Sequence, residues 1–440
     1  MRTLDEWLEY QQRIHPRDVE LGLERIGEVW RRMGAPRPAP VVITVGGTNG
    51  KGSSVACLEA ILAAAGKRVG CYTSPHLLRY NERVRVLGID VKDAALIAAF
   101  EAIESVRQEI ALTYFEFGTL AALWTFAQSA LDVAVLEVGL GGRLDAVNMI
   151  DADAAIVVTV DLDHMDWLGS DRDSIGREKA GIFRAQRPAI VGMRDPPRGL
   201  ITEAKRIGAQ LQLAGRDFSV TPQIDAWRWQ SELTGHAQGG DDCADTLMLP
   251  APGLPGLCQI DNAAAAIAAV HALRDRLGWN PRAIANGVAA ARVPARLHRF
   301  TRAGRADLMI DVAHNPQAAG ALAQWLAHQG PNAGNLAVFG ALQDKDVGGV
   351  IAPMLSHIDV WFAADLSAAS PRGLDLNELV ARMRTASADA AISEHASVAA
   401  ALDAAATTAG DTGRIVAFGS FFIAAAALEW AEQNGYRAAG

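Results

Sequence analysis

The chain has 440 residues, of which 50% are hydrophobic and 21% charged, a composition that excludes a disordered or fibrous protein. This length predicts two domains, each long enough to bury its own core. The 41 lysines and arginines against 50 aspartates and glutamates give a formal net charge of −9. Because nothing global attracts nucleic acid or anionic lipid, an anionic ligand needs a local site.

The four cysteines are too few and too irregularly spaced for a disulfide framework, and none forms a C-x-x-C pair. The first residues lack the apolar core of a signal peptide, and no 18-residue apolar run follows. We therefore expect a cytoplasmic protein that binds neither nucleic acid nor a membrane.

The first part of the chain alternates short apolar runs with helical stretches. Residues 41–45 predict a buried strand, Gly46 and Gly47 a turn, and residues 53–65 a helix. Further strands are predicted at 133–138, 154–160 and 188–191, and helices at 94–110, 119–129 and 174–183. This alternation is typical of a parallel sheet covered by helices.

A polar stretch at 221–245 with Trp227 and Trp229 interrupts this pattern and indicates a small antiparallel insertion or an irregular lobe. Helical composition resumes at 262–277, and a break near Arg296 predicts a domain boundary. We expect an N-terminal domain over residues 1–295, with an insertion at about 221–247, and a C-terminal domain over 296–440.

The C-terminal part repeats the alternation of strands and helices. Strands are predicted at 307–310, 336–339, 360–363 and 414–418, and helices at 317–327, 376–385, 398–407 and 421–434. Two α/β domains joined by a hinge are expected to form a cleft, because open parallel sheets bind ligands beyond their strand ends.

The strongest local motif is the glycine-rich segment Gly46-Gly47-Thr48-Asn49-Gly50-Lys51-Gly52-Ser53-Ser54, between the first strand and helix. Such a loop captures phosphate: its N–H groups approach the oxygens, the helix N-terminus adds positive potential, and Lys51 neutralises charge. The spacing departs from the usual Walker motif because Gly52 follows Lys51, so a metal-binding hydroxyl would shift to Ser53 or Ser54. The alternative is a glycine turn that only caps the helix.

Two further side chains follow buried strands. Glu137 ends one strand at a glycine-rich turn, and His164 follows Asp161 and Asp163 after the next. The carboxyl ends of parallel strands face the ligand crevice, where oxygen and imidazole donors hold Mg²⁺ against nucleotide phosphates. A surface turn acid and a structural histidine are the alternatives.

The segment G-T-N-G-K-G-S resembles the nucleotide loop of the Mur ligase superfamily, and most closely that of the folylpolyglutamate synthases and dihydrofolate synthases. Other segments resemble this family in the same order along the chain. They are residues 4–26, 73–77, 81–83, 114–117, 137–145, 161–164, 177–182, Gln259 with Asn262, and 311–316.

The resemblance implies a Mur ligase-like α/β fold, with an N-terminal parallel-sheet P-loop ATPase domain and a C-terminal Rossmann-like domain. It also implies the following site residues. Nucleotide contacts are Thr48, Asn49, Gly50, Lys51, Gly52, Ser53, Asn262, Arg296 and Asp311; Mg²⁺ ligands are Ser74, Glu137 and His164; catalytic residues are Lys51, Lys179 and His314.

Lys179 lies in a predicted helix after Glu178, where an ordinary solvated ion pair is the simpler interpretation. The resemblance implies instead that this lysine is carbamylated to N6-carboxylysine, which turns a cation into an anionic oxygen ligand for the metal.

In the second domain, Asp311 and His314 close a strand before a helix. Asn315 and Pro316 fit the N-cap and the first position of a helix. The segment is therefore interpreted both as a helix cap and as part of a ligand site. By resemblance, His314 lies near the reacting phosphate and the incoming amino acid, and Lys345 adds charge there. Two segments depart from the family pattern: around Arg296, Ala295 and Leu297 stand in place of a glycine and an acid or amide, and Val147 stands in place of a frequent threonine.

The segment after the predicted strand at 69–73 is cationic, with His76, Arg79 and Arg83, and suits an anionic or heteroaromatic substrate; a solvated loop is the alternative. By resemblance this loop contributes to the pterin and benzoate pocket. The substrate-binding residues implied are His76, Arg83, Thr113, Tyr114, Phe115, Glu116, Leu144 and Asp145.

The implied activity is an ATP-dependent ligase that joins L-glutamate to 7,8-dihydropteroate and to reduced folates through an acyl phosphate, with domain closure excluding water. ATP is then a substrate, Mg²⁺ the metal, a monovalent cation a further candidate, and the protein a monomer. The alternatives are a folylpolyglutamate synthase alone, another Mur-type amino acid ligase, or a nucleotide-gated binding protein without ligation.

Overall fold

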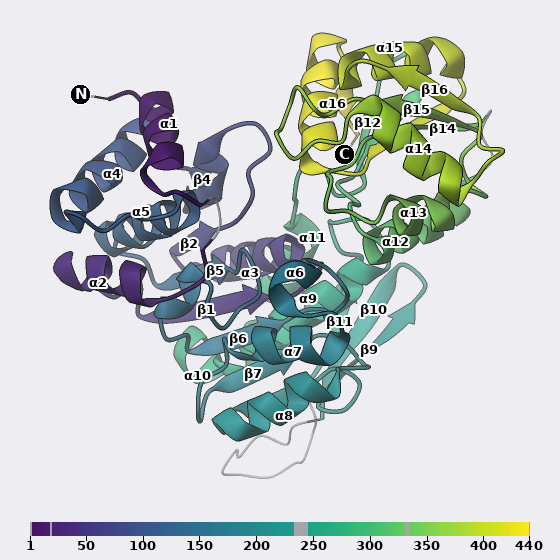
Figure 1. Ribbon diagram of the computed structural model, residues 1–440. Helices are drawn as coiled ribbons and strands as arrows, with labels where there is room; N and C mark the ends of the chain where they lie inside the picture. Colours follow the sequence, from purple (N-terminus) through teal and green to yellow (C-terminus); the bar gives the residue numbers. More distant parts are fainter. Residues whose placement is uncertain (1, 18–19, 233–244, 331–333, 440) are drawn as a thin grey trace. The chain divides into compact units, whose positions relative to one another are not determined.

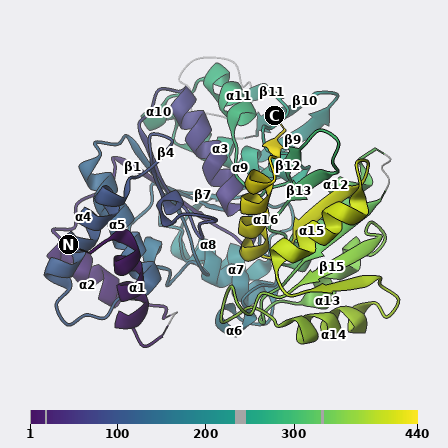
Figure 2. The same cartoon turned by 90° about the horizontal axis from the view of Figure 1, so that it is seen from above.

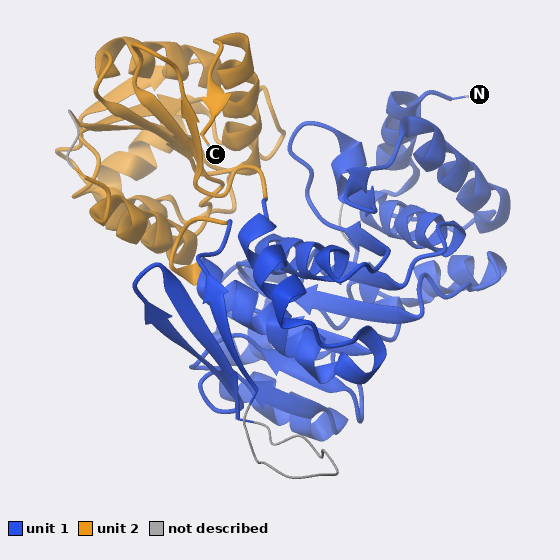
Figure 3. Cartoon of the chain, turned by 180° about the vertical axis from the view of Figure 1, so that it is seen from behind, with its two compact units in different colours: residues 1–253, 259–292 blue, residues 254–258, 293–440 orange. Residues whose placement is uncertain are grey.

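The computed structural model describes residues 2–17, 20–232, 245–330 and 334–439. The chain divides into two compact units, coloured separately in Figure 3. Unit 1 comprises residues 1–253 and 259–292, and unit 2 comprises residues 254–258 and 293–440. Among the described residues, no helix combines the length and the apolar character needed to cross a bilayer.

Unit 1 is built on an eight-stranded sheet with the order β4-β3-β2-β5-β1-β6-β7-β8. The strands are β1 (Val41–Gly46), β2 (Val69–Tyr72), β3 (Val84–Val86), β4 (Ile89–Asp90), β5 (Val133–Glu137), β6 (Ala154–Val157), β7 (Pro188–Val191) and β8 (Gln210–Leu213). All pairings from β2 to β8 are parallel, whereas β3 and β4 form an antiparallel edge. The predicted parallel sheet is confirmed, and the edge hairpin was not predicted.

The helices of unit 1 cover both faces of this sheet (Figures 1 and 2). They are α1 (Leu4–Ile14), α2 (Glu24–Arg32), α3 (Lys51–Ala64), α4 (Asp93–Arg107), α5 (Tyr114–Gln128), α6 (Met165–Leu168), α7 (Arg172–Ala180), α8 (Arg198–Ile207), α9 (Cys258–Ala272), α10 (Arg274–Leu277) and α11 (Pro281–Ala290). Helices α4, α5, α7 and α8 share one apolar core with Val42, Leu136 and Val157. Helix α3 lies against β1, β2 and β5 and packs on α11.

The alternation of side chains along a strand explains these two cores. Successive residues of a strand point to opposite faces, so strands buried on both sides are apolar throughout. All six residues of β1 are buried, and Val42 faces one core while its neighbour Ile43 is buried outside that core.

The predicted insertion is a three-stranded antiparallel sheet with the order β11-β10-β9. Its strands are β9 (Phe218–Gln223), β10 (Ala226–Ser231) and β11 (Thr246–Pro250). Trp227 and Trp229 on β10 are fully buried, which identifies the alternating tryptophans as core residues of this small sheet. The part of the insertion at 233–244 lies outside the described residues.

Unit 2 contains a seven-stranded sheet with the order β16-β15-β14-β17-β13-β12-β18. The strands are β12 (His298–Thr301), β13 (Asp307–Ile310), β14 (Asn335–Phe339), β15 (Val360–Ala364), β16 (Ile392–His395), β17 (Arg414–Phe418) and β18 (Arg437–Ala438). The helices are α12 (Pro316–Ala327), α13 (Val347–Ile351), α14 (Leu376–Ala386), α15 (Val398–Ala409) and α16 (Phe421–Gln433). The four predicted strands are confirmed, and β12, β16 and β18 were not predicted.

Candidate functional site

The glycine-rich loop joins the end of β1 to the start of α3. The backbone N–H of Thr48 donates to the carbonyl of Thr159 (2.8 Å), and the hydroxyl of Thr159 accepts the N–H of Asn49 (2.9 Å). Gly47 and Gly50 have positive φ values of 147° and 84°, which side-chain-bearing residues rarely adopt. The Lys51 ammonium donates to the carbonyls of Gly47 (3.0 Å) and Thr48 (3.2 Å), so the lysine folds over the loop at the helix N-terminus.

Two predicted site residues lie directly against this loop. A Cβ atom built on Gly52 would lie 3.8 Å from Oε2 of Glu137, and one built on Gly50 would overlap the amide oxygen of Asn262. Asn262 is buried on α9, and its Nδ2 donates to Oε1 of Gln259 (2.9 Å). The loop therefore needs glycine at position 50 to make room for Asn262.

The hydroxyls predicted to replace the Walker serine are buried. Ser54 is fully buried, and its Oγ donates to the carbonyl of Asn262 (3.3 Å). Ser53 is 2% exposed. Ser54 thus already has a structural partner, which leaves Ser53 as the better candidate for a phosphate or metal contact.

The predicted metal ligands follow neighbouring parallel strands. Ser74 follows β2, Glu137 ends β5, and His164 follows the strand β6, while the loop with Lys51 follows β1. Strands β2, β5, β1 and β6 are adjacent and parallel, so their carboxyl ends lie on the same side of the sheet. These residues therefore come from the carboxyl-terminal side of the sheet.

His164 adopts a left-handed backbone (φ 49°) as the residue before α6, and its Nε2 lies 3.9 Å from Oδ1 of Asp163. Glu137 is 5% exposed. Within the described ranges no three residues of the types His, Cys, Asp and Glu come together as a metal-binding group. The predicted set contains only two such residues and a serine, so the remaining coordination positions would belong to nucleotide oxygens and water, as is usual for Mg²⁺.

Lys179 is buried on α7, only 3% exposed, and the interpretation as a solvated ion pair is wrong. Its neighbour Glu178 pairs with Arg143 (3.0 Å) instead. Burial lowers the pKa of Lys179 to about 7, and the cation of Lys51 acts in the same direction. The negative charges of Asp163 and Asp145 act in the opposite direction and raise this pKa. A buried amine of this kind is neutral in a large fraction of molecules near pH 7.

Asp145 is buried in the glycine-rich turn after β5. Its carboxylate accepts the N–H groups of Leu140 (2.9 Å) and Val147 (3.1 Å). Burial raises the pKa of Asp145 to about 6, although these N–H groups and the charge of Lys51 lower it. Val147, where the family often has threonine, is fully buried, so a side chain without a hydroxyl suits this position.

The predicted substrate residues lie on two further segments. Nε of Arg83 donates to Nδ1 of His76 (2.8 Å), and the guanidinium lies 5.3 Å from the ring centre of Tyr80 and 5.6 Å from that of Tyr114. Burial lowers the pKa of His76 to about 4, and Arg83 acts in the same direction. His76 is therefore a neutral hydrogen-bond acceptor at pH 7.

The residues Thr113 to Glu116 form the start of α5, five residues before the predicted helix start. Thr113 and Glu116 make a reciprocal capping box: the Glu116 N–H donates to Oγ1 of Thr113 (3.2 Å), and the Thr113 N–H donates to Oε2 of Glu116 (2.8 Å). Phe115 packs on the ring of Tyr72, with 6.0 Å between ring centres, and against Gly139. The capping box was present in the sequence and was the signal that could have located this helix start.

In unit 2, Asp311 follows β13 and accepts the N–H groups of Leu297 and Ala313, each at 2.8 Å. Burial raises the pKa of Asp311, although the charge of Arg296 and the hydrogen bonds from these N–H groups lower it. Asn315 caps α12 by accepting the N–H of Ala318 (3.0 Å), as predicted.

Two predicted residues of unit 2, Arg296 and His314, lie near one aromatic ring, and a third, Lys345, lies beside Asp344. The guanidinium of Arg296 lies 5.9 Å from the ring centre of Phe421, and the ring of His314 lies 6.2 Å from the same ring. Lys345 is 9% exposed, and its ammonium lies 3.6 Å from Asp344. Phe421, the first residue of α16, was not singled out in the sequence, and its only signal there is its position after Gly419 and Ser420.

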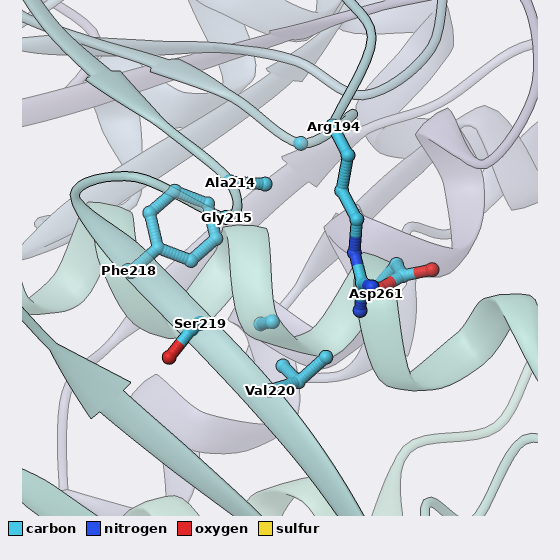
Figure 4. Close-up of a pocket in the computed structure, with 9 residues that line it drawn as sticks. Arg194, Ala214, Gly215, Phe218, Ser219, Val220 and Asp261 are labelled. Atoms are coloured by element: carbon cyan, nitrogen blue, oxygen red, sulfur yellow. The ribbon is translucent and has the colours of Figure 1, made fainter.

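A small polar pocket lies elsewhere in unit 1 (Figure 4). Arg194 and Asp261 point toward one another there, beside Phe218 and Ser219 at the start of β9. No predicted site residue lines it.

The chain is similar to known proteins along most of its length. Residues 45–270 match the Mur ligase middle domain, and residues 295–421 match the Mur ligase glutamate ligase domain. The chain is 44% identical to the dihydrofolate synthase/folylpolyglutamate synthase of Escherichia coli over 97% of its own length and 95% of the relative. It is 37% identical to the protein of the same name from Haemophilus influenzae, over 87% of each chain.

Solved structures show the same similarity. Escherichia coli FolC in complex with DHPP and ADP superposes with a TM-score of 0.89 at 42% identity, over 99% of both chains. A bifunctional folylpolyglutamate synthase/dihydrofolate synthase with Mn, AMPPNP and L-glutamate bound gives a TM-score of 0.86 at 40% identity, over 98% of both chains. Two Mur ligase domains in this order, with similarity along almost the whole length, place the chain in the dihydrofolate synthase/folylpolyglutamate synthase family of the Mur ligases.

Proposed function

We propose that this chain is an ATP-dependent ligase that joins L-glutamate to 7,8-dihydropteroate and to reduced folates. The main support is that Lys51, Glu137 and His164 lie at or after the carboxyl ends of neighbouring parallel strands in the sheet of unit 1. The named activities of the relatives, and the ATP analogue, Mn and L-glutamate bound by one of them, support the same reaction.

The reaction has two steps. A carboxylate oxygen of the pteroate or folate attacks the γ-phosphorus of ATP, which forms an acyl phosphate and releases ADP. The neutral amine of glutamate then attacks the acyl carbon, phosphate leaves, and the amine loses a proton. The first step turns a poor leaving group into a good one.

The residues of unit 1 serve the first step. The N–H groups of the loop and the Lys51 ammonium are suited to bind the triphosphate and offset its charge. Ser74, Glu137 and His164 would hold a divalent cation, proposed to be Mg²⁺, which supplies further positive charge to the phosphate oxygens. Asn262 is assigned to the nucleotide because it lies against Gly50.

Lys179 is proposed to carry a carbamate. Its buried amine lies near Lys51, Asp163 and Asp145, so the modified side chain would place an anionic oxygen pair near the Lys51 cation. The neutral amine adds to CO₂ and releases one proton. Mass spectrometry of the intact protein in bicarbonate, compared with Lys179→Met, is expected to show one added carboxyl group only in the unaltered chain.

In unit 2, Arg296 and Asp311 are assigned to the nucleotide and His314 to the transferring phosphate and glutamate. The support is that the Asp311 carboxylate and the Phe421 ring hold the turns that carry Arg296 and His314. His76, Arg83, Thr113, Tyr114, Phe115, Glu116, Leu144 and Asp145 are assigned to the pteroate or folate. A monomeric, cytoplasmic enzyme remains part of the proposal; the monomer rests on the family resemblance, and the cytoplasmic location on the few, irregularly spaced cysteines.

The test is phosphate release with ATP and Mg²⁺. Release is expected only when dihydropteroate and glutamate are both present, and tetrahydrofolate is expected to replace dihydropteroate. Glutamate-dependent release with tetrahydrofolate but not with dihydropteroate would identify a folylpolyglutamate synthase without dihydrofolate synthase activity. Sustained ADP release that needs neither the acyl substrate nor glutamate would favour a nucleotide-gated binding protein and contradict the proposal.

A further inference from the structure

Arg25, the second residue of α2, links two carboxylates from distant parts of unit 1. Its Nη1 donates to Oε1 of Glu20 (2.7 Å), and its Nη2 donates to the backbone carbonyl of Glu20 and to Oε1 of Glu116 (both 3.1 Å). Glu116 lies 91 residues further along the chain. One guanidinium therefore joins the segment before α2 to the start of α5.

The Glu116 carboxylate has a divided role. Oε2 accepts the Thr113 N–H and completes the capping box, while Oε1 faces Arg25. The side chain of Glu116 is only 3% exposed. A buried carboxylate needs a compensating partner, and Arg25 is the cation that supplies it.

The same short segment also reaches the second wall of the proposed substrate pocket. The N–H of Gly22 donates to the carbonyl of Leu144 (3.3 Å), the residue before Asp145. Glu20, in turn, lies 3.3 Å from Nε2 of His15 after α1. Residues 20–25 thus contact both Glu116 and Leu144, which belong to the two walls assigned to the pteroate or folate.

The orientation of Arg25 is set by these carboxylate partners. Both terminal nitrogens are used, while Nε is buried without a hydrogen-bond partner in the described part of the chain. A buried N–H left without a partner is destabilising. This cost is acceptable where the arginine is needed to bridge Glu20 and Glu116 at once.

We infer that Arg25 is a positioning residue that holds the Thr113–Glu116 and Leu144–Asp145 walls in place for the pteroate or folate substrate. The inference rests on the proposed function, because those walls are assigned to that substrate there. Arg25 acts through Glu20 and Glu116 and is not itself a catalytic residue.

The experiment compares Arg25→Lys and Arg25→Met with the control Arg32→Met. Arg32 is the same residue type on the same helix, with a similarly exposed side chain (24% against 26%), and it also bonds a carboxylate, Glu28, and backbone carbonyls. It is not part of the proposed site, so its variant measures the cost of losing a half-buried arginine from α2.

We expect Arg25→Met to raise the KM for dihydropteroate about 10- to 100-fold, with the KM for ATP and kcat changed less than about threefold, because uniform substrate binding is lost. Arg25→Lys is expected to fold like the unaltered protein and still to raise this KM about tenfold, since one ammonium cannot replace a planar fork between two carboxylates. Arg32→Met is expected to lower Tm without changing any KM.

A double-mutant cycle separates positioning from simple stabilisation. Glu116→Gln combined with Arg25→Met is expected to raise the KM for dihydropteroate by less than the product of the two single effects, because both changes weaken the link between Arg25 and Glu116. Additive effects, or wild-type KM values in Arg25→Lys, would overturn the inference while the proposed function stands. Absence of dihydropteroate-dependent phosphate release from the unaltered chain would instead reject the proposed function.

Discussion

The carboxylate of Asp311 accepts the backbone N–H of Leu297 at 2.8 Å, and so fixes the turn that carries Arg296. The residues on both sides of Arg296 have left-handed backbones, with φ of 54° at Ala295 and 47° at Leu297. Side-chain-bearing residues adopt this conformation at a cost of roughly 1–2 kcal/mol each. The proposed nucleotide contact therefore lies on a strained turn held by Asp311.

The strain at Ala295 predicts an unusual tolerance for glycine. Ala295→Gly relieves the backbone strain but loses a buried methyl group and adds freedom to the unfolded chain, so we expect the free energy of unfolding to change by less than about 0.5 kcal/mol. Ala291→Gly is the control, because Ala291 is also buried but has a negative φ of −57°. Its free energy of unfolding should fall by about 1–2 kcal/mol.

Denaturant titration of both glycine variants provides the measurement. Equal losses in the two variants would show that the left-handed backbone of Ala295 stores no strain. The resemblance described above implies glycine at this position, and glycine adopts the positive φ found at Ala295 without penalty.

The features that the sequence could predict are local ones. The loop from Gly46 to Ser54 and the carboxyl end of the strand at Glu137 depend on contiguous residues whose apolar runs end at glycines. For that reason the parallel sheet was predictable, whereas the assignment of Glu137 to a metal stays a prediction. The helix predicted at 119–129 begins five residues after the true start of α5, which the Thr113–Glu116 capping box marks.

Other features depend on contacts that no short segment contains. The edge strands β3 and β4 have three and two residues, too short for a periodic signal, and the two-residue strand β18 pairs with β12, from the opposite end of unit 2 in the sequence. The link between Arg25 and Glu116 spans 91 residues, and the burial of Lys179 follows from the packing of α7. Such long-range pairings are set by tertiary structure.

The carboxylate and imidazole predicted to hold the divalent cation should be essential for turnover. We expect Glu137→Gln and His164→Ala each to lower kcat about 1,000-fold, the equivalent of ~4 kcal/mol in the transition state. Folding should persist, because His164 is partly exposed and glutamine is nearly isosteric with Glu137. The measurement is phosphate release at saturating substrates together with Tm.

Glu203→Gln is the control for charge removal in unit 1, since the side chain of Glu203 is 12% exposed on α8 and pairs with Arg206. It should retain turnover close to that of the unaltered chain. Normal turnover in both Glu137→Gln and His164→Ala would reject the assignment of these residues to the metal.

Lys179 should make stability depend on pH. Burial lowers its pKa from 10.5 to about 7, so between these values the unfolded chain binds one more proton than the folded chain. Stability contributed by this group therefore rises as the pH increases from 7 toward 10.5. Relative to Lys179→Met, the free energy of unfolding of the unaltered chain should increase by about 2 kcal/mol between pH 7 and pH 9.

Buffers freed of CO₂ are needed for that measurement, so that the amine itself titrates. Parallel pH profiles of Lys179→Met and the unaltered chain would show that the ammonium is as well solvated in the folded protein as in the unfolded one, and that its burial has been misread.

Asp153 joins three arginines and the start of β1. Its carboxylate accepts hydrogen bonds from Arg37 (2.6 Å), Arg276 (2.7 Å), Arg187 and the N–H of Val42 (2.8 Å), and its side chain is 4% exposed. Asp153→Asn leaves three cations around a neutral amide. The free energy of unfolding is expected to fall by about 2 kcal/mol, since the buried side chain loses charge-assisted hydrogen bonds while the half-exposed arginines can be solvated.

The control for Asp153→Asn is Asp132→Asn, which breaks an exposed pair with Arg68 and should cost less than about 1 kcal/mol.

Burial opposes ionisation of Asp153, but the hydrogen bonds from Arg276 and Val42 and the arginine charges lower its pKa below 3.8. A lowered pKa means that the stabilisation is complete above pH 3.8 and is lost as the pH falls through the folded-state value. The difference between Asp153→Asn and the unaltered chain should therefore be constant from pH 7 to pH 5 and shrink only below about pH 4. A difference that already shrinks between pH 7 and pH 5 would point to a titrating group other than Asp153.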